Sequence, residues 1–115
     1  VEKITKNAFR KNKKVTKVKI GKNVKVIEDG AFSGCNKLNS VITGASLSKI
    51  GKNVFANDKN LKKIDLRNSK KIKSVGSGTF KGISKKAIIK VPKRKMKAYK
   101  KLLKTGSLAK SVKLK

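Results

Sequence analysis

The strongest constraint in this sequence is a repeat of about 23 residues. Phenylalanine recurs in it at Phe9, Phe32, Phe55 and Phe80. Three further apolar columns keep the same interval: Ile4, Ile27, Ile50 and Val75; Val15, Leu38 and Leu61; Val18, Val41 and Ile64. Four apolar positions that share one period predict an α/β repeat solenoid, in which each unit buries its apolar face against its neighbours.

Each unit carries two local patterns. Residues 15–20, 38–43 and 61–66 alternate between apolar and polar side chains, which predicts a short strand with one face turned inward. A fourth strand is expected at residues 87–91. The second pattern ends in the repeating Phe and is preceded by Gly and Asn. It indicates a tight loop and one helical turn that directs the Phe into the core.

The array changes character after its fourth strand. Pro92 stops strand pairing and suits a helix entry, and apolar residues then fall at helical spacing up to residue 104. A solenoid needs a cap on its last open face, so a capping helix is expected at residues 93–106. A basic membrane-surface helix is the alternative interpretation. Residues 1–92 are then the array, and residues 107–115 a tail that is either a short extra strand or disordered.

The charge of the chain is extreme, with 34 basic residues against 5 acidic ones and a net charge of +29. This balance favours attraction to polyanions such as wall teichoic acid, anionic glycans or nucleic acid. The alternative is a solvated lysine coat that keeps a repeat protein soluble. Arginines and stacking aromatics are scarce, which argues against specific nucleic-acid recognition.

The residue types needed for catalysis are poorly represented. The chain has no His, and among its five carboxylates only Glu28 and Asp29 are adjacent, where capping of a helical turn is the simpler role. No phosphate loop, metal-ligand cluster or nucleophile–base pair is recognisable, so we expect no enzyme, no cofactor, no metal and no small-molecule substrate. The single cysteine, Cys35, is interpreted as a semi-buried spacer, with a reactive thiol as the alternative.

Residues 24–38 read V-x-x-I-x-x-x-A-F-x-x-C-x-x-L. This unit resembles the leucine-rich repeat, in particular the BspA-type (Treponema-type) subclass with a 23-residue period, over residues 4–106. The resemblance implies a right-handed coil with short parallel strands on the concave side, one-turn helices on the convex side and a C-terminal capping helix. Thr43 and Gly44 depart from the pattern in the second strand, and Lys85 and Lys86 in the fourth.

The resemblance also implies an extracellular module of a larger bacterial cell-surface or secreted protein, which mediates protein–protein contact or cell adhesion. The chain opens inside a repeat, and we interpret it as part of a longer protein. Electrostatic binding of polyanions through the lysine-rich surface is the alternative function. The first unit is expected to leave an apolar edge at Ile4, through which the domain would self-associate weakly.

Concave faces of solenoids are their usual binding surfaces. The strand residues expected to point outward there are the candidate binding positions: Lys17, Lys19, Ser40, Ile42, Lys63, Asp65, Ile88 and Lys90. Ile42 and Ile88 are the informative members, because an exposed large apolar side chain beside charges can anchor a partner.

Overall fold

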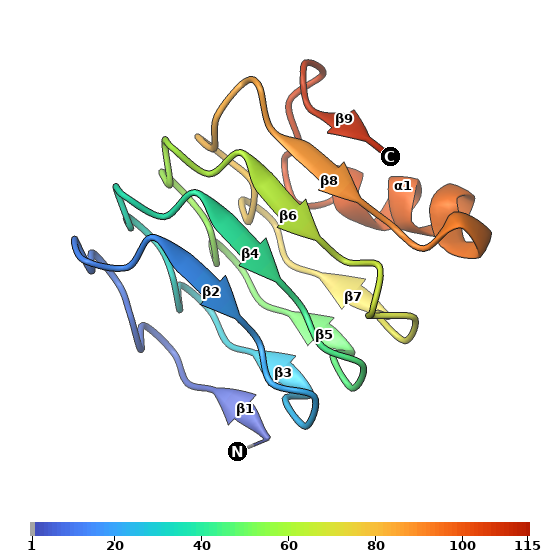
Figure 1. Cartoon of the computed structure of the whole chain (residues 1–115), viewed down its shortest axis with the longest axis horizontal. Coiled ribbons are helices and arrows are strands. Elements are labelled where there is room, and N and C mark those ends of the chain that lie inside the picture. The colour runs from blue at the N-terminus through green and yellow to red at the C-terminus, as the bar shows by residue number, and fades with distance from the viewer. Residues whose placement is uncertain (1) are drawn as a thin grey trace.

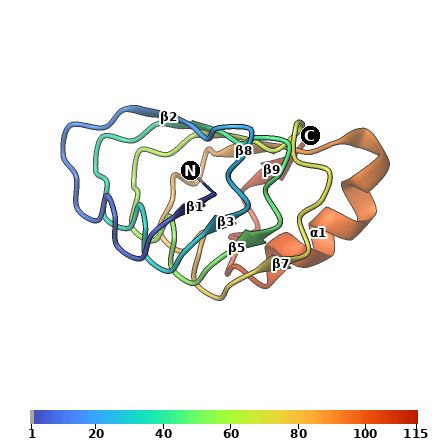
Figure 2. The ribbon, with the colours of Figure 1, turned by 90° about the horizontal axis from the view of Figure 1, so that it is seen from below.

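The computed structural model describes residues 2–115 and consists of stacked coils that build two parallel sheets (Figure 1). The five-stranded sheet runs in the order β2 (Lys17–Lys19), β4 (Ser40–Ile42), β6 (Lys63–Asp65), β8 (Ile88–Lys90) and β9 (Lys113–Leu114). The four-stranded sheet runs in the order β1 (Lys3–Ile4), β3 (Val26–Ile27), β5 (Lys49–Ile50) and β7 (Ser74–Val75). Seen from below, the coils nest one behind another (Figure 2).

The register of both sheets follows the sequence period. Lys17 pairs with Ser40 and Ser40 with Lys63, which are steps of 23 residues, whereas Lys63 pairs with Ile88, a step of 25. The four-stranded sheet makes the same longer step from Lys49 to Ser74. The two extra residues therefore lie between β6 and β7, in the loop that contains Lys70 and Lys71.

The turns that carry the Phe residues are not helical, which corrects the expectation of one-turn helices on the convex side. Within residues 2–115 the helical segments are the 3-10 turn η1 (Lys93–Lys95) and the helix α1 (Met96–Lys104). Each Phe turn contains left-handed residues, such as Gly30 at φ 68° and Asn53 at φ 56°, which interrupt a right-handed helix. The backbone of each turn instead bonds to the next coil, as from Phe32 N–H to the Val54 carbonyl oxygen at 3.0 Å.

The core lies between the two sheets and the row of Phe turns. Ring centroids of consecutive Phe residues are 5.2, 5.9 and 6.3 Å apart along the stack. Phe32, Phe55 and Phe80 are buried, whereas Phe9 is 41% exposed at the first coil. The departure at Thr43 is accommodated, because its buried hydroxyl donates to the Asp65 carbonyl oxygen at 3.2 Å and bonds to the Ser69 hydroxyl.

The helix α1 packs against the last coil. Its Tyr99 hydroxyl donates to the Ser69 carbonyl oxygen and accepts the Ile72 N–H at 3.1 Å. Just after the helix, the Thr105 hydroxyl donates to the Val75 carbonyl oxygen at 2.9 Å, and the Gly106 carbonyl accepts the Phe80 N–H at 2.8 Å. In residues 2–115 no helix combines the length and the apolar content that crossing a membrane requires.

The tail continues the five-stranded sheet. Of the two states expected for it, the strand is confirmed, since β9 pairs in parallel with β8 through Ile88 and Lys113. Val112 is buried in the core, and Leu108 and Leu114 pack partly buried against it.

Candidate binding face

The outward residues of the five-stranded sheet stand in two columns, because parallel pairing places partner residues side by side about 4.8 Å apart. The first column is Lys17, Ser40, Lys63, Ile88 and Lys113. The second column is Lys19, Ile42, Asp65 and Lys90. All eight candidate positions predicted from the sequence therefore lie on one surface, which we call the strand face.

The strand β4 forms a trough in the strand face. Its short Ser40 and apolar Ile42 are flanked by Lys17 and Lys19 of β2 on one side and by β6 on the other. Ile42 is 36% exposed, which makes it an exposed large apolar residue on this sheet. An apolar floor between cationic walls can accept an apolar side chain and an acidic group at the same time.

Two hollows meet at Ile42. The first, of about 780 Å³, lies at the carboxyl ends of β2, β4 and β6, and its cations are Lys19, Lys22, Arg67, Lys70 and Lys71. The second, of about 650 Å³, lies toward the amino ends of the same strands, and its cations are Lys17, Lys37, Lys62 and Lys63. Ile42 lines both hollows, so they form one surface over β4.

Asp65, the acidic residue of the strand face, forms an ion pair within the chain. The guanidinium of Arg67 donates two hydrogen bonds to the Asp65 carboxylate. Its Nε lies 3.0 Å from Oδ1, and a terminal nitrogen lies 2.8 Å from Oδ2. These hydrogen bonds hold the pKa of Asp65 below its usual range, despite partial burial. Asp65 therefore stays ionised and paired, and the remaining lysines dominate the field of this face.

Ile88 differs from its expected exposure. It is half-buried rather than exposed, and Lys113 of β9 lies beside it. Ile42, between Lys19 and the paired Asp65, keeps 36% of its surface exposed. The apolar anchor of the strand face is thus Ile42 rather than the pair of isoleucines.

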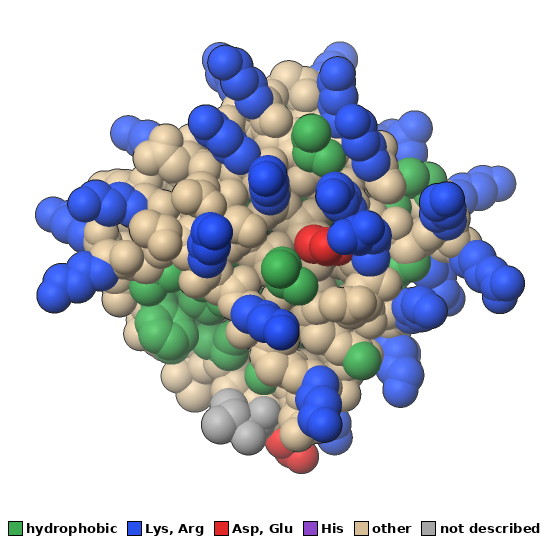
Figure 3. All heavy atoms as spheres, in the orientation of Figure 1, with side chains coloured by type: hydrophobic (Ala, Val, Ile, Leu, Met, Phe, Trp, Pro, Cys, Tyr) green, Lys and Arg blue, Asp and Glu red, His purple; other side chains and the backbone are tan. Residues whose placement is uncertain are grey.

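Sequence reasoning missed several cations that surround the first hollow: Lys22, Arg67, Lys70 and Lys71. They lie in loops after the strands, where alternation in the strand gives no information. The 25-residue unit was the available signal, because its two extra residues enter this loop. In the space-filling view, cationic side chains are spread over this side of the molecule, and few acidic ones are seen (Figure 3).

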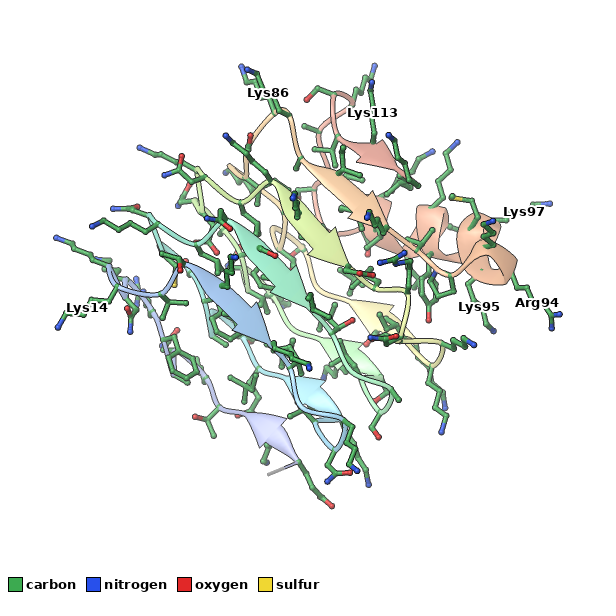
Figure 4. The ribbon with its side chains drawn as sticks, in the orientation of Figure 1. Lys14, Lys86, Arg94, Lys95, Lys97 and Lys113 are labelled. Atoms are coloured by element: carbon green, nitrogen blue, oxygen red, sulfur yellow. The ribbon has the colours of Figure 1, made fainter. Side chains whose placement is uncertain are left out.

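The cationic side chains also extend well beyond the strand face. Arg94, Lys95 and Lys97 project from the helical end of the molecule, and Lys14 projects from the opposite end (Figure 4). The charge therefore acts as a general field over the surface, and the trough over β4 is distinguished by its apolar floor.

Cys35 lies in the interior and is not poised as a nucleophile. It is fully buried, and its thiol donates to the Phe9 carbonyl oxygen at 3.2 Å. Burial and the neighbouring Asp58 carboxyl raise the pKa of the thiol to about 11. The spacer interpretation fits this environment, because a buried thiol with a raised pKa carries little of the reactive thiolate.

Asp58 occupies the matching position one coil later and is fully buried. Its Oδ1 accepts the Cys35 N–H at 2.7 Å, while its Oδ2 has no hydrogen-bond partner. Burial raises the pKa of this carboxyl to about 8. The group lies in the stack away from the strand face, so its chemistry concerns stability.

The geometry of the strand face supports non-covalent binding. Among the described residues, no group of three or more His, Cys, Asp or Glu side chains is placed to hold a metal ion. What the face offers is an apolar contact at Ile42, hydroxyl and amide groups beside it, and a ring of cations.

Comparison with known proteins gives a family match and no close relative. The family model described as BspA type leucine-rich repeat region matches residues 2–114, in six copies. No curated protein and no solved structure matches the chain.

Proposed function

Because the chain belongs to the BspA-type leucine-rich repeat family, we propose that it is a non-enzymatic protein-binding module that uses the strand face. Its partner presents an acidic surface with an apolar side chain that fits over β4. The observation that carries this proposal is Ile42, an exposed apolar residue that lines both hollows between cationic walls.

The proposed setting is a secreted or surface-attached bacterial protein, with the module serving in adhesion. The support is the family, whose repeats often occur in surface or secreted proteins. Residues 93–106 are proposed to cap a right-handed coil, because Tyr99 and Gly106 bond to the backbone of the last coil.

A second candidate function is electrostatic binding of a polyanion. It is favoured by the five cations around the first hollow, which face outward at the ends of three adjacent strands. Polyanion binding releases condensed counterions, so its affinity falls steeply with salt. Protein recognition at an apolar anchor depends less on salt, and this difference separates the two functions.

The test is a binding panel of matrix proteins, mucin, heparin, teichoic acid and duplex DNA, at about 0.05 and 0.3 M salt. We expect one protein ligand to keep its affinity at the higher salt. Ile42→Asp should lower that affinity by about 2 kcal/mol or more, as for a central interface residue. Ala98→Asp, which makes the same charge change at an exposed site on α1, is the matched control.

Two outcomes would contradict the proposal. Equal losses in Ile42→Asp and Ala98→Asp would mean that net charge governs binding and the strand face does not. Binding to every polyanion that disappears at the higher salt would favour the second function. In that case, neutralising Lys70 and Lys71 with Gln should reduce the steepness of the salt dependence.

A further inference from the structure

A separate hollow of about 380 Å³ lies between α1 and the tail, away from the trough over β4. Its volume is in the range of small-molecule sites in proteins. Most of its lining side chains are apolar, and three lysines stand among them. This combination distinguishes it from the lysine-covered surface elsewhere.

The helical wall of the hollow is a single stripe of α1. Met96, Lys100 and Lys104 are spaced by four residues and therefore share one side of the helix. The core-facing side of α1 is a different one, carried by the buried Tyr99 and Leu103. Lys100 and Lys104 of this stripe are exposed, whereas Met96 is half-buried and also packs against the core.

The opposite wall comes from the tail. Leu108, Val112 and Leu114 supply its apolar surface, and Lys110 lies among them. Leu108 and Leu114, like Met96 across the hollow, are half-buried, so each keeps apolar surface in contact with solvent. Covering such surface is favourable by about 25 cal/mol per Å².

The lysines of the hollow have no acidic side chain near them in sequence. The chain contains no Asp or Glu after Asp65, so residues 66–115 carry cations without a carboxylate side chain among them. The ion pairs of the described residues, Lys25 with Glu2 and Arg67 with Asp65, involve none of the three lysines. Among the described residues, Lys100, Lys104 and Lys110 are thus available to pair with the anion of a ligand.

We propose that this helix–tail hollow binds a single long-chain anionic amphiphile of the fatty-acid class. The hydrocarbon chain lies against Met96, Leu108 and Leu114, and the carboxylate is held among Lys100, Lys104 and Lys110. A small inorganic anion would leave the apolar surface uncovered, and an uncharged hydrocarbon would leave the lysines unpaired. A ligand with both parts matches both features of the lining.

The experiment is a calorimetric titration of the folded protein with octanoate, decanoate and dodecanoate, all below their micelle concentrations, at one fixed salt concentration. Each added methylene that enters the hollow should raise affinity about fourfold, the equivalent of about 0.8 kcal/mol per buried CH₂. Dodecanol tests the need for the carboxylate, and acetate tests the need for the chain. Both should bind at least tenfold more weakly than dodecanoate.

Matched double variants separate the hollow from the general charge. Lys100→Gln with Lys104→Gln should weaken dodecanoate binding about tenfold, as expected when two exposed ion pairs are lost. Lys97→Gln with Lys101→Gln removes the same charge from exposed positions of the same helix that do not line the hollow, and should leave affinity unchanged. All four lysines are exposed, so both variants should fold, which circular dichroism would verify.

Three results would overturn the proposal: an affinity independent of chain length, equal weakening in the two double variants, or dodecanol binding as tightly as dodecanoate. A Leu108→Ser variant gives an independent check on the tail. It should flatten the chain-length dependence while the affinity for octanoate changes little.

Discussion

The Phe position of the repeat differs in exposure between the two ends of the stack. Phe9 in the first coil is 41% exposed, whereas Phe80 in the last Phe turn is 1% exposed. Within residues 2–115, Phe9 stacks on Phe32 and on no second Phe ring. Phe80 stacks on Phe55 and is covered by the chain at Gly106. The repeat thus specifies where each Phe lies along the stack, and the neighbouring segment decides whether it is buried.

The segment after α1 takes over the bonding role of a further coil. In earlier coils the N–H of each Phe donates to a carbonyl one coil later, as Phe9 does to Ala31 at 2.7 Å. Phe80 donates in the same way to Gly106, although Gly106 belongs to no Phe turn. An added Cβ at position 106 would stand 2.6 Å from Phe80 Cδ2, so glycine permits this close approach. The weak self-association expected at the edge near Ile4 stays a prediction.

The largest expected contrast lies in the Phe stack itself. Phe32→Ala and Phe80→Ala each remove a buried ring and should cost about 3–5 kcal/mol of unfolding free energy. Phe9→Ala should cost about 1 kcal/mol, because its ring is already partly hydrated. Urea denaturation followed by circular dichroism measures all three. Equal losses at Phe9 and Phe80 would show that the ring of Phe9 is as well packed as the ring of Phe80.

The next contrast concerns the column Asn12, Cys35, Asp58 and Ile83, in which Asn12 is half-buried and the Asp58 carboxyl is buried. The pKa of Asp58 is about 8 in the folded chain against 3.8 for the free group. Between about pH 4 and pH 8, the Asp58 carboxyl is therefore protonated in the folded state and ionised in the unfolded state. Stability from this group should fall as pH rises, by up to about 1.4 kcal/mol per pH unit.

Asp58→Asn isolates this effect, because the amide keeps an acceptor for the Cys35 N–H and does not ionise. Relative to the parent chain, the variant should become more stable as pH rises from 4 to 8, as measured by urea denaturation at each pH. Asp65→Asn is a control of opposite sign. Arg67 lowers the pKa of Asp65 in the folded state. The stabilisation from this carboxylate is therefore present above about pH 4 and is lost in acid. A pH-independent difference for Asp58→Asn would contradict the prediction.

The smallest expected effect tests the attachment of α1. Tyr99→Phe keeps the ring but leaves the Ser69 carbonyl oxygen and the Ile72 N–H without this partner, at a cost of about 1–3 kcal/mol. Thermal unfolding should detect the loss, and hydrogen exchange should show it concentrated in the last coil. Thr16→Val, at an exposed position just before β2, is the control and should change stability by less than about 0.5 kcal/mol. Uniform exchange along the stack would argue against a local attachment.

Sequence reasoning located the strands of the five-stranded sheet and the order of their outward side chains, because alternation and the repeat interval both follow from pairing between coils. It did not anticipate the second sheet or the turn backbone. Val26, Lys49 and Ser74 have no common polarity, so two-residue strands there leave no alternating pattern. The left-handed turns were misread as helical, because Asn and Gly before Phe are compatible with both local structures.

What the sequence by itself determined is the one-dimensional order: the period, the Phe stack, the strand columns and a helix after Pro92. The reason is that stacked repeats bury the same positions in every unit, so apolar residues recur in the sequence at a fixed interval. Only the tertiary structure decided that Ile42 remains exposed while Ile88 does not, that loop cations gather around Ile42, and that a hollow opens between α1 and the tail. These features depend on contacts between segments that differ from the repeat, and the repeat interval carries no information about them.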